Sequence, residues 1–142
     1  IRDQSTFYTK NGIESVTLDE LLQQSDIVSL HLPLTESTLG IISEEKLTHM
    51  RPEALLVNCA RGGLVDETAL KVALSENRIA GAAFDVFHTE PPDDPDLMGL
   101  PNFLATPHIG GSSEEAILAM GRAAIDGLSN ATIPDPAGFS NL

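Results

Sequence analysis

The sequence has little positive charge and almost no cysteine. Eight Lys and Arg residues stand against 21 Asp and Glu residues among 142, which gives a formal net charge of −13. Such a chain repels phosphates, so neither nucleic acid nor an anionic membrane surface is expected as a partner. Cys59 is the single cysteine, which excludes an internal disulfide and gives no sign of an oxidising compartment. We therefore expect a cytoplasmic location.

Long hydrophobic runs and several familiar site motifs are also missing. No apolar run reaches about 18 residues, so no membrane span is expected. The sequence contains no GxxxxGK[ST] phosphate loop, no GxSxG nucleophile elbow and no GxGxxG turn, which argues against a P-loop enzyme and a serine hydrolase. The His, Asp and Glu residues lack the short spacings of zinc or calcium sites, so no metal is expected.

Short apolar runs alternate with helical patterns along the chain. Short apolar segments at residues 25–32, 54–60, 79–86 and 102–106 read as strands, and continuous apolar runs of this length are typical of strands buried on both faces of a parallel sheet. Helices are predicted between and after them, at residues 18–24, 44–50, 66–77 and 113–129. Strands separated by helices indicate an α/β fold with a parallel sheet and right-handed crossovers.

Helix start signals support this order. Thr17 with Glu20, and Ser112 with Glu115, match the capping-box pattern. The acidic segment at residues 93–96 is interpreted as a solvated connection. Prolines in residues 131–142 predict an irregular tail.

Polar residues that follow the predicted strands are candidates for a site, because ligands of open parallel sheets bind beyond the carboxyl ends of the strands. Arg61 could hold a carboxylate in its planar fork, or be a surface arginine in a turn. His108 could act as an acid or base, or be structural. Glu90 could orient His108, or be a solvated loop acid. Asp85 closes an apolar strand, where a bare charge is costly unless paired. Asn58 has a similar place at the end of its strand, and could equally be a capping or turn-making residue.

Four ordered blocks resemble a known family. HLPLTESTLGII, LLVNCARGGLVDETAL, IAGAAFDVFHTEPP and LPNFLATPHIGG are similar, in order and spacing, to the D-isomer-specific 2-hydroxyacid dehydrogenases. The resemblance implies an NAD(P)-binding Rossmann-like domain that takes part in the reversible reduction of a 2-oxo acid to a D-2-hydroxy acid. The first βαβ unit with its GxGxxG turn, and the substrate domain, are not found. We therefore expect a partial Rossmann domain at residues 1–130, followed by the tail at 131–142.

The resemblance also implies roles for single residues. Arg61 would bind the substrate carboxylate, His108 would exchange a proton with the substrate oxygen, and Glu90 would pair with His108. The residues expected to contact the cofactor, NAD with NADP left open, are Asp3, Leu32, Pro33, Cys59, Ala60, Arg61, Asp85, His108 and Gly110. A small 2-oxo or 2-hydroxy acid is the expected substrate, and a homodimer is the expected assembly.

Two other hypotheses stay open at this point. Transcriptional corepressors of the C-terminal-binding type resemble the same family and keep the same Arg, Glu and His, so the chain could be an NAD-sensing binding module. It could also be a structural fragment with no activity of its own.

Overall fold

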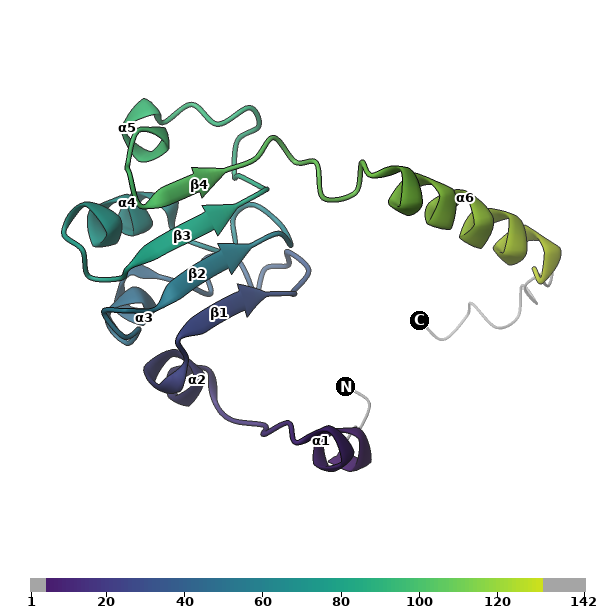
Figure 1. Cartoon of the computed structure of the whole chain (residues 1–142), viewed down its shortest axis with the longest axis horizontal. Coiled ribbons are helices and arrows are strands. Elements are labelled where there is room, and N and C mark those ends of the chain that lie inside the picture. Colours follow the sequence, from purple (N-terminus) through teal and green to yellow (C-terminus); the bar gives the residue numbers. More distant parts are fainter. Residues whose placement is uncertain (1–4, 132–142) are drawn as a thin grey trace. The chain divides into compact units, whose positions relative to one another are not determined.

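The computed structural model of the chain describes residues 5–131 (Figure 1). Within them, a parallel sheet has the strand order β1-β2-β3-β4, formed by β1 (Ile27–Leu30), β2 (Leu55–Asn58), β3 (Gly81–Phe84) and β4 (Phe103–Ala105). The chain divides after His108 into two compact units. The first holds the sheet with α1 (Ser5–Asn11), α2 (Leu18–Gln24), α3 (Glu44–Thr48), α4 (Glu67–Ser75) and α5 (Pro95–Met98), and the second holds α6 (Glu114–Ser129).

The predicted α/β fold with a parallel sheet is confirmed. Each strand lies inside its predicted apolar run but is shorter than the run. Some flanking apolar residues are buried, such as Ala54 before β2 and Val86 after β3, while Leu32 after β1 is 40% exposed.

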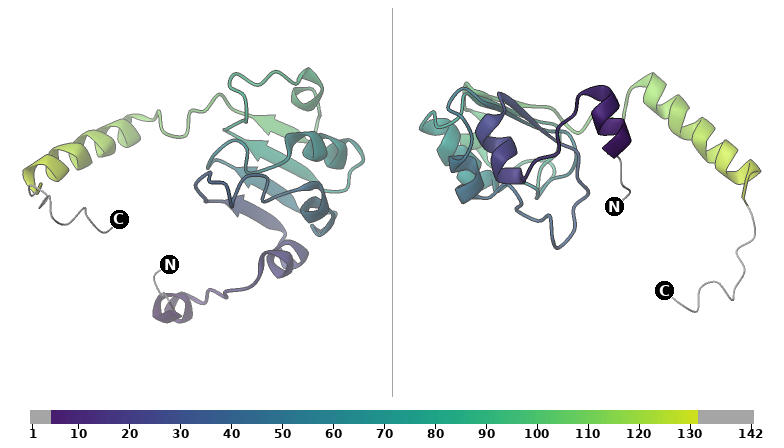
Figure 2. Two further views of the ribbon diagram at one scale, coloured as in Figure 1. Left: turned by 180° about the vertical axis from the view of Figure 1, so that it is seen from behind. Right: turned by 90° about the horizontal axis from the view of Figure 1, so that it is seen from below.

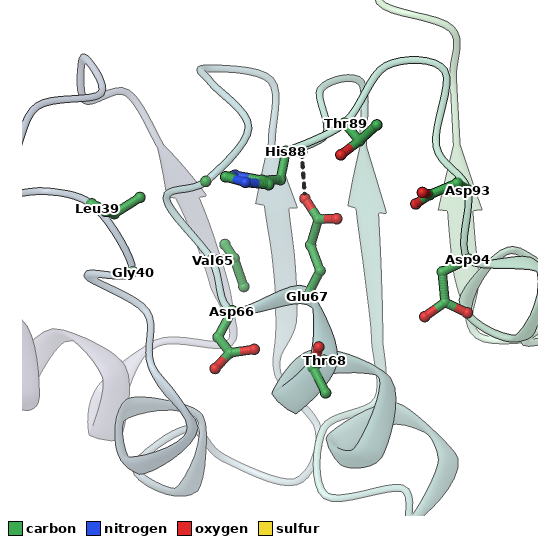
Figure 3. Close-up of a pocket in the computed structure, with 11 residues that line it drawn as sticks. Leu39, Gly40, Val65, Asp66, Glu67, Thr68, His88, Thr89, Asp93 and Asp94 are labelled. Carbon is green, nitrogen blue, oxygen red and sulfur yellow. Dashed lines mark hydrogen bonds between the residues drawn. The ribbon is translucent and has the colours of Figure 1, made fainter.

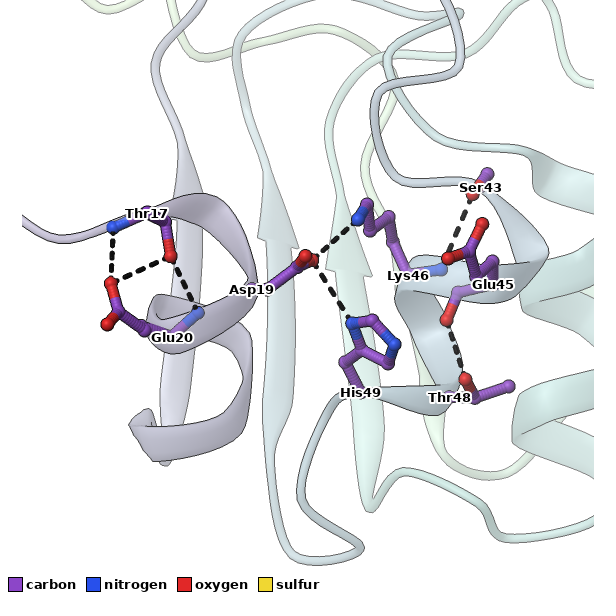
Figure 4. A network of polar contacts seen from close by, with 8 residues as sticks. All are labelled: Thr17, Asp19, Glu20, Ser43, Glu45, Lys46, Thr48 and His49. Carbon is purple, nitrogen blue, oxygen red and sulfur yellow. Dashed lines mark hydrogen bonds and ion pairs between the residues drawn. The ribbon is translucent and has the colours of Figure 1, made fainter.

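Capping residues fix where the helices begin. Before α2, Glu20 N–H donates to Thr17 Oγ1 at 3.3 Å and Thr17 N–H donates to Glu20 Oε2 at 2.9 Å, the predicted reciprocal box (Figure 4). Asp19 on α2 accepts hydrogen bonds from Lys46 and His49, which ties α2 to α3. The predicted box between Ser112 and Glu115 is wrong. Ser113 caps α6 and accepts from Ala116 N–H at 3.2 Å, so the third helical position holds no glutamate.

The prediction for the acidic segment at residues 93–96 also needs correction. It was predicted as a solvated connection, but Asp94 caps the short helix α5, with Pro95 at its first turn. Asp94 Oδ2 also lies 2.6 Å from Lys71 Nζ on α4. The hydrogen bond from Lys71 lowers the pKa of Asp94. The ion pair and the cap therefore make this segment structural. Helix α1 was also not predicted.

Within the described part of the first unit, residues 5–108, the sheet is covered on one face only. Val28, Leu56 and Phe84 are buried in one core cluster, to which the helices contribute Leu22, Leu47, Leu70, Leu74 and Leu97. Helices α3 and α4 lie on this side of the sheet (Figure 1 and Figure 2). On the other face Ile27 and Leu104 are both 62% exposed and Leu55 is 41% exposed. The expected burial on both faces is therefore wrong, because successive residues of a strand point to opposite faces.

The second unit is built around α6. The predicted apolar stripe of this helix includes Ile117 and Met120, and both side chains are exposed.

No helix in residues 5–131 combines the length and the apolar character that crossing a bilayer requires. The expected tail lies, apart from Ala131, outside the described residues, as does Asp3. The expected domain of residues 1–130 stays a prediction.

Candidate active site at the carboxyl edge of the sheet

Three hollows follow the carboxyl edge of the sheet, where β1 to β4 end. One of about 320 Å³ is lined by His31, Leu32, Pro33, Cys59, Ala60 and Arg61. A second of about 200 Å³ includes Cys59, Asp85 and Thr106. A third of about 340 Å³ includes Asp85, Phe87, Glu90, Thr106 and His108. Because Cys59 and Asp85 each line two of them, the hollows form one continuous row, which is called the edge groove below.

Glu90 and His108 form a contact at one end of the edge groove. Glu90 Oε2 lies 2.8 Å from His108 Nδ1, and Glu90 Oε1 accepts from the Phe87 N–H at 3.1 Å. The hydrogen bond with His108 lowers the pKa of Glu90, and the Phe87 N–H acts in the same direction. Because Nδ1 faces the carboxylate, Nε2 is the nitrogen of His108 that can exchange a proton with a ligand.

The backbone at His108 has an unusual conformation. Its φ of 54° lies in the left-handed region, where residues other than glycine are uncommon. The His108 N–H donates to the Thr106 carbonyl at 3.0 Å, which holds the turn. The peptide bond between Glu90 and Pro91 is cis. Residues in sparsely populated backbone regions persist only where their surroundings determine them, and they are concentrated at functional sites.

Asp85 lies at the centre of the edge groove. Its side chain is buried, and its carboxylate accepts a hydrogen bond from Thr106 Oγ1 at 2.5 Å. Its backbone N–H donates to the Asn58 carbonyl at 3.0 Å, which continues the ladder between β3 and β2. The neutral Thr106 hydroxyl thus stabilises the buried carboxylate, and the expectation that this charge is paired stays a prediction.

Asn58 shapes the turn that carries Arg61. Its side chain is 1% exposed; Nδ2 donates to the Arg61 carbonyl at 2.9 Å, and Oδ1 accepts from the Ala60 N–H at 3.1 Å. The turn-making interpretation of Asn58 is therefore confirmed. The Arg61 side chain is exposed, and Nη1 donates to the Ala60 carbonyl at 2.7 Å. It lines a different hollow of the edge groove from His108.

Glycine allows the Arg61 turn to touch the loop that carries Glu90. A Cβ built on Gly62 would lie 1.8 Å from the Phe87 carbonyl oxygen, so only a residue without a side chain fits there. Gly63, with a φ of 82°, supplies the left-handed conformation of the turn. Glycine is thus required at position 62 by the close approach of the Phe87 backbone, and it is favoured at position 63 by the left-handed backbone conformation.

Glu67 makes a hydrogen bond that the sequence did not predict. It begins α4, and its Oε1 accepts from the His88 N–H at 2.8 Å (Figure 3). Burial raises the pKa of Glu67, and the hydrogen bond from His88 opposes this change. Figure 3 shows its side chain extending from the start of α4 to the backbone at His88, beside a hollow of about 420 Å³ that Asp93 and Asp94 also line. An acid in a first turn gives no sequence signal of such a distant partner.

The predicted site residues are brought together in part. The edge groove contains Leu32, Pro33, Cys59, Ala60, Arg61, Asp85, Glu90 and His108. Gly110 belongs to the second unit, so its expected contact with the cofactor stays a prediction, and Asp3 lies outside the described residues. No group of three or more His, Cys, Asp or Glu side chains in residues 5–131 is arranged to hold a metal ion.

The residues of the edge groove suit a dinucleotide. An open groove at the carboxyl edge of a parallel sheet is where such cofactors bind. Leu32 and Pro33 offer an apolar wall, and the buried carboxylate of Asp85 offers an acceptor for a carboxamide. Which half of the cofactor these residues contact stays a prediction from the resemblance.

Comparison with known proteins gives a consistent result. A family model described as "D-isomer specific 2-hydroxyacid dehydrogenase, NAD binding domain" matches residues 2–110. A D-3-phosphoglycerate dehydrogenase of Bacillus subtilis (strain 168) is 46% identical over 109 residues, which cover 77% of this chain and 21% of that protein. The chain thus spans about a fifth of the length of the curated relative.

Solved structures share the fold. A glyoxylate reductase from Paecilomyes thermophila has a TM-score of 0.83 and 37% identity, covering 92% of this chain and 39% of the other. A glyoxylate/hydroxypyruvate reductase from Sinorhizobium meliloti, in complex with NADP and malonate, has a TM-score of 0.73 and 35% identity, covering 80% and 35%. The family model matches well over half of the sequence. The chain therefore belongs to the D-isomer specific 2-hydroxyacid dehydrogenase family, where it matches the NAD-binding domain.

Proposed function

We propose that this chain serves an NAD(P)-dependent oxidoreductase that interconverts a 2-oxo acid and a D-2-hydroxy acid. The observation that carries the proposal is the Glu90–His108 contact of 2.8 Å, which lies in the edge groove of a chain that belongs to this family. Relatives named glyoxylate reductase and glycerate dehydrogenase support a small 2-oxo or 2-hydroxy acid as the substrate. A solved relative with bound NADP keeps both nicotinamide dinucleotides open.

Each residue has a task that its position allows. A bound nicotinamide cofactor supplies or accepts the hydride. In reduction, negative charge develops on the carbonyl oxygen of the substrate, and His108 offsets it by giving a proton from Nε2. Glu90 fixes the tautomer and the orientation of His108 by accepting at Nδ1. Arg61 is one of only eight Lys and Arg residues in an acidic chain, and its fork binds the carboxylate of the substrate.

A comparison of variants tests the role of Arg61. In the complete protein that contains this chain, Arg61→Ala should lower kcat/KM for 2-oxo acids by about ten- to a hundredfold, the loss expected for a charged hydrogen-bond pair. NADH binding, measured by cofactor fluorescence, should change far less. The matched control is Arg78→Ala, which removes an arginine paired with Glu76 on the surface. Equal losses of turnover and NADH binding would show that Arg61 is structural.

The other hypotheses give different results in the same assays. Intact NADH binding without turnover of any 2-oxo acid, including glyoxylate and hydroxypyruvate, would refute the oxidoreductase and favour the NAD-sensing corepressor. The named relatives are enzymes, so no comparison favours that alternative. Titration of NADH with the 142-residue chain tests the structural-fragment hypothesis, which saturable binding would contradict. The cytoplasmic location stays a prediction from the composition, and the homodimer stays a prediction from the resemblance.

A further inference from the structure

One peptide group joins the two loops of the candidate site. The peptide between Phe87 and His88 donates its N–H to Glu67 Oε1 at 2.8 Å. Its carbonyl oxygen lies against Gly62, where a Cβ would come within 1.8 Å of it. The group is therefore held on one side by the first residue of α4, and on the other by the turn that carries Arg61.

The same loop leads directly to Glu90. The Phe87 N–H donates to Glu90 Oε1 at 3.1 Å, while Glu90 Oε2 contacts His108. The Phe87 ring is buried against Phe84 and Phe103 and anchors the start of the loop. The side chains at positions 88–90 are all exposed, so packing constrains this part of the loop little. The hydrogen bond that the His88 N–H donates to Glu67 therefore restrains the loop between the anchor and Glu90, together with the close contact at Gly62 and the Phe87–Glu90 hydrogen bond.

The position of Glu67 makes this bond hard to replace. The carboxylate is half-buried, and burial together with the charges of Asp93 and Asp94 raises its pKa, while the His88 N–H stabilises the charged form. A half-buried carboxylate that lost its donor would keep the cost of its lost hydration. The side chain and the loop therefore hold each other in place.

We propose that Glu67 is a positioning residue, which acts through the His88 N–H to hold the Phe87–Glu90 loop where Glu90 meets His108. The inference rests on the proposed function, because the Glu90–His108 contact has a catalytic meaning only in that reaction. Glu67 itself touches neither His108 nor the edge groove as lined above.

Nuclear magnetic resonance of the full 142-residue chain tests the proposal without any turnover. Glu67→Ala removes the acceptor, Glu67→Gln keeps a carbonyl oxygen at the same reach, and Glu44→Ala is the control at the first position of α3. In Glu67→Ala, the His88 amide should exchange with solvent about tenfold faster or more, as expected when one hydrogen bond is lost. The pKa of Glu90 should rise toward its ordinary value, because its contacts weaken. Glu67→Gln and Glu44→Ala should leave both readouts unchanged.

Other outcomes overturn the proposal. A Glu90 titration that is unchanged in Glu67→Ala would confine the hydrogen bond to local structure. Glu67→Gln behaving like Glu67→Ala would show that the charge of Glu67, and not its hydrogen bond, acts on Glu90. If Glu67→Ala does not fold, Glu67→Asp, which is shorter by one methylene, replaces it. A rise in the Glu90 pKa in Glu67→Asp supports the proposal, and an unchanged Glu90 pKa overturns it. Failure of the proposed function would appear separately, as missing turnover of 2-oxo acids.

Discussion

Substitution of Gly62 by alanine should destabilise the fold strongly through sterics alone. The new methyl group would lie 1.8 Å from the Phe87 carbonyl oxygen, 2.1 Å from the Phe87 carbonyl carbon and 2.6 Å from the His88 nitrogen. All three are backbone atoms, and the buried Phe87 ring prevents the loop from moving away. Overpacking of this kind costs about 1–3 kcal/mol and occasionally more, so we expect a loss of about 3 kcal/mol in the free energy of unfolding.

Urea denaturation followed by circular dichroism measures this loss, since the chain contains no tryptophan for fluorescence. Gly40→Ala is the matched control, because Gly40 has a φ of 61° and open space around its Cβ position. Its cost is conformational only, about 1–2 kcal/mol. If Gly62→Ala costs less than Gly40→Ala, the Arg61 turn and the Glu90 loop can separate freely. The packing argument for this part of the site would then be wrong.

Two further predictions concern protonation. In the complete protein, His108→Asn should flatten the pH profile of 2-oxo acid reduction near neutrality, as measured by initial rates of NADH oxidation; an unchanged profile would reject His108 as the proton donor. Asp94→Asn should lower the urea midpoint at neutral pH, because Lys71 holds the pKa of Asp94 below its ordinary value. A pKa that is lower in the folded state than in the unfolded state stabilises the fold at pH values above the unfolded-state pKa. This stabilisation is lost as the pH falls through the folded-state pKa. The difference between the two proteins should therefore shrink below about pH 4, and a difference independent of pH would contradict the ion pair.

Much of the fold could be predicted because each strand lies in a short, mostly apolar segment. The same property hid which face is covered: a run such as Leu55-Leu56-Val57 is apolar at every position, so its pattern cannot show that Leu55 is exposed and Leu56 buried. Helix α5 was missed for another reason. Its cap, Asp94, lies in an acidic segment whose charge suggests solvent, and the partner that changes this, Lys71, is 23 residues away.

In the candidate site, too, contacts between residues near one another in the sequence were easier to predict than contacts between distant residues. The resemblance implied that Glu90 pairs with His108, and the structure places the two in contact. The turn made by Asn58 involves neighbours within three residues and was among the sequence-based interpretations. The hydrogen bond from the His88 backbone N–H to the Glu67 side chain spans 21 residues. Such a bond depends on where a loop meets the start of a helix, which no residue pattern records.

The uncovered face of the sheet bears on how the chain behaves in solution. Ile27, Leu55 and Leu104 offer apolar surface, while a net charge of −13 keeps like molecules apart. Added salt screens this repulsion, and acid neutralises it by protonating carboxylates, yet neither removes the apolar face. We therefore expect the colloidal stability of the chain in dilute neutral buffer to depend on electrostatic repulsion.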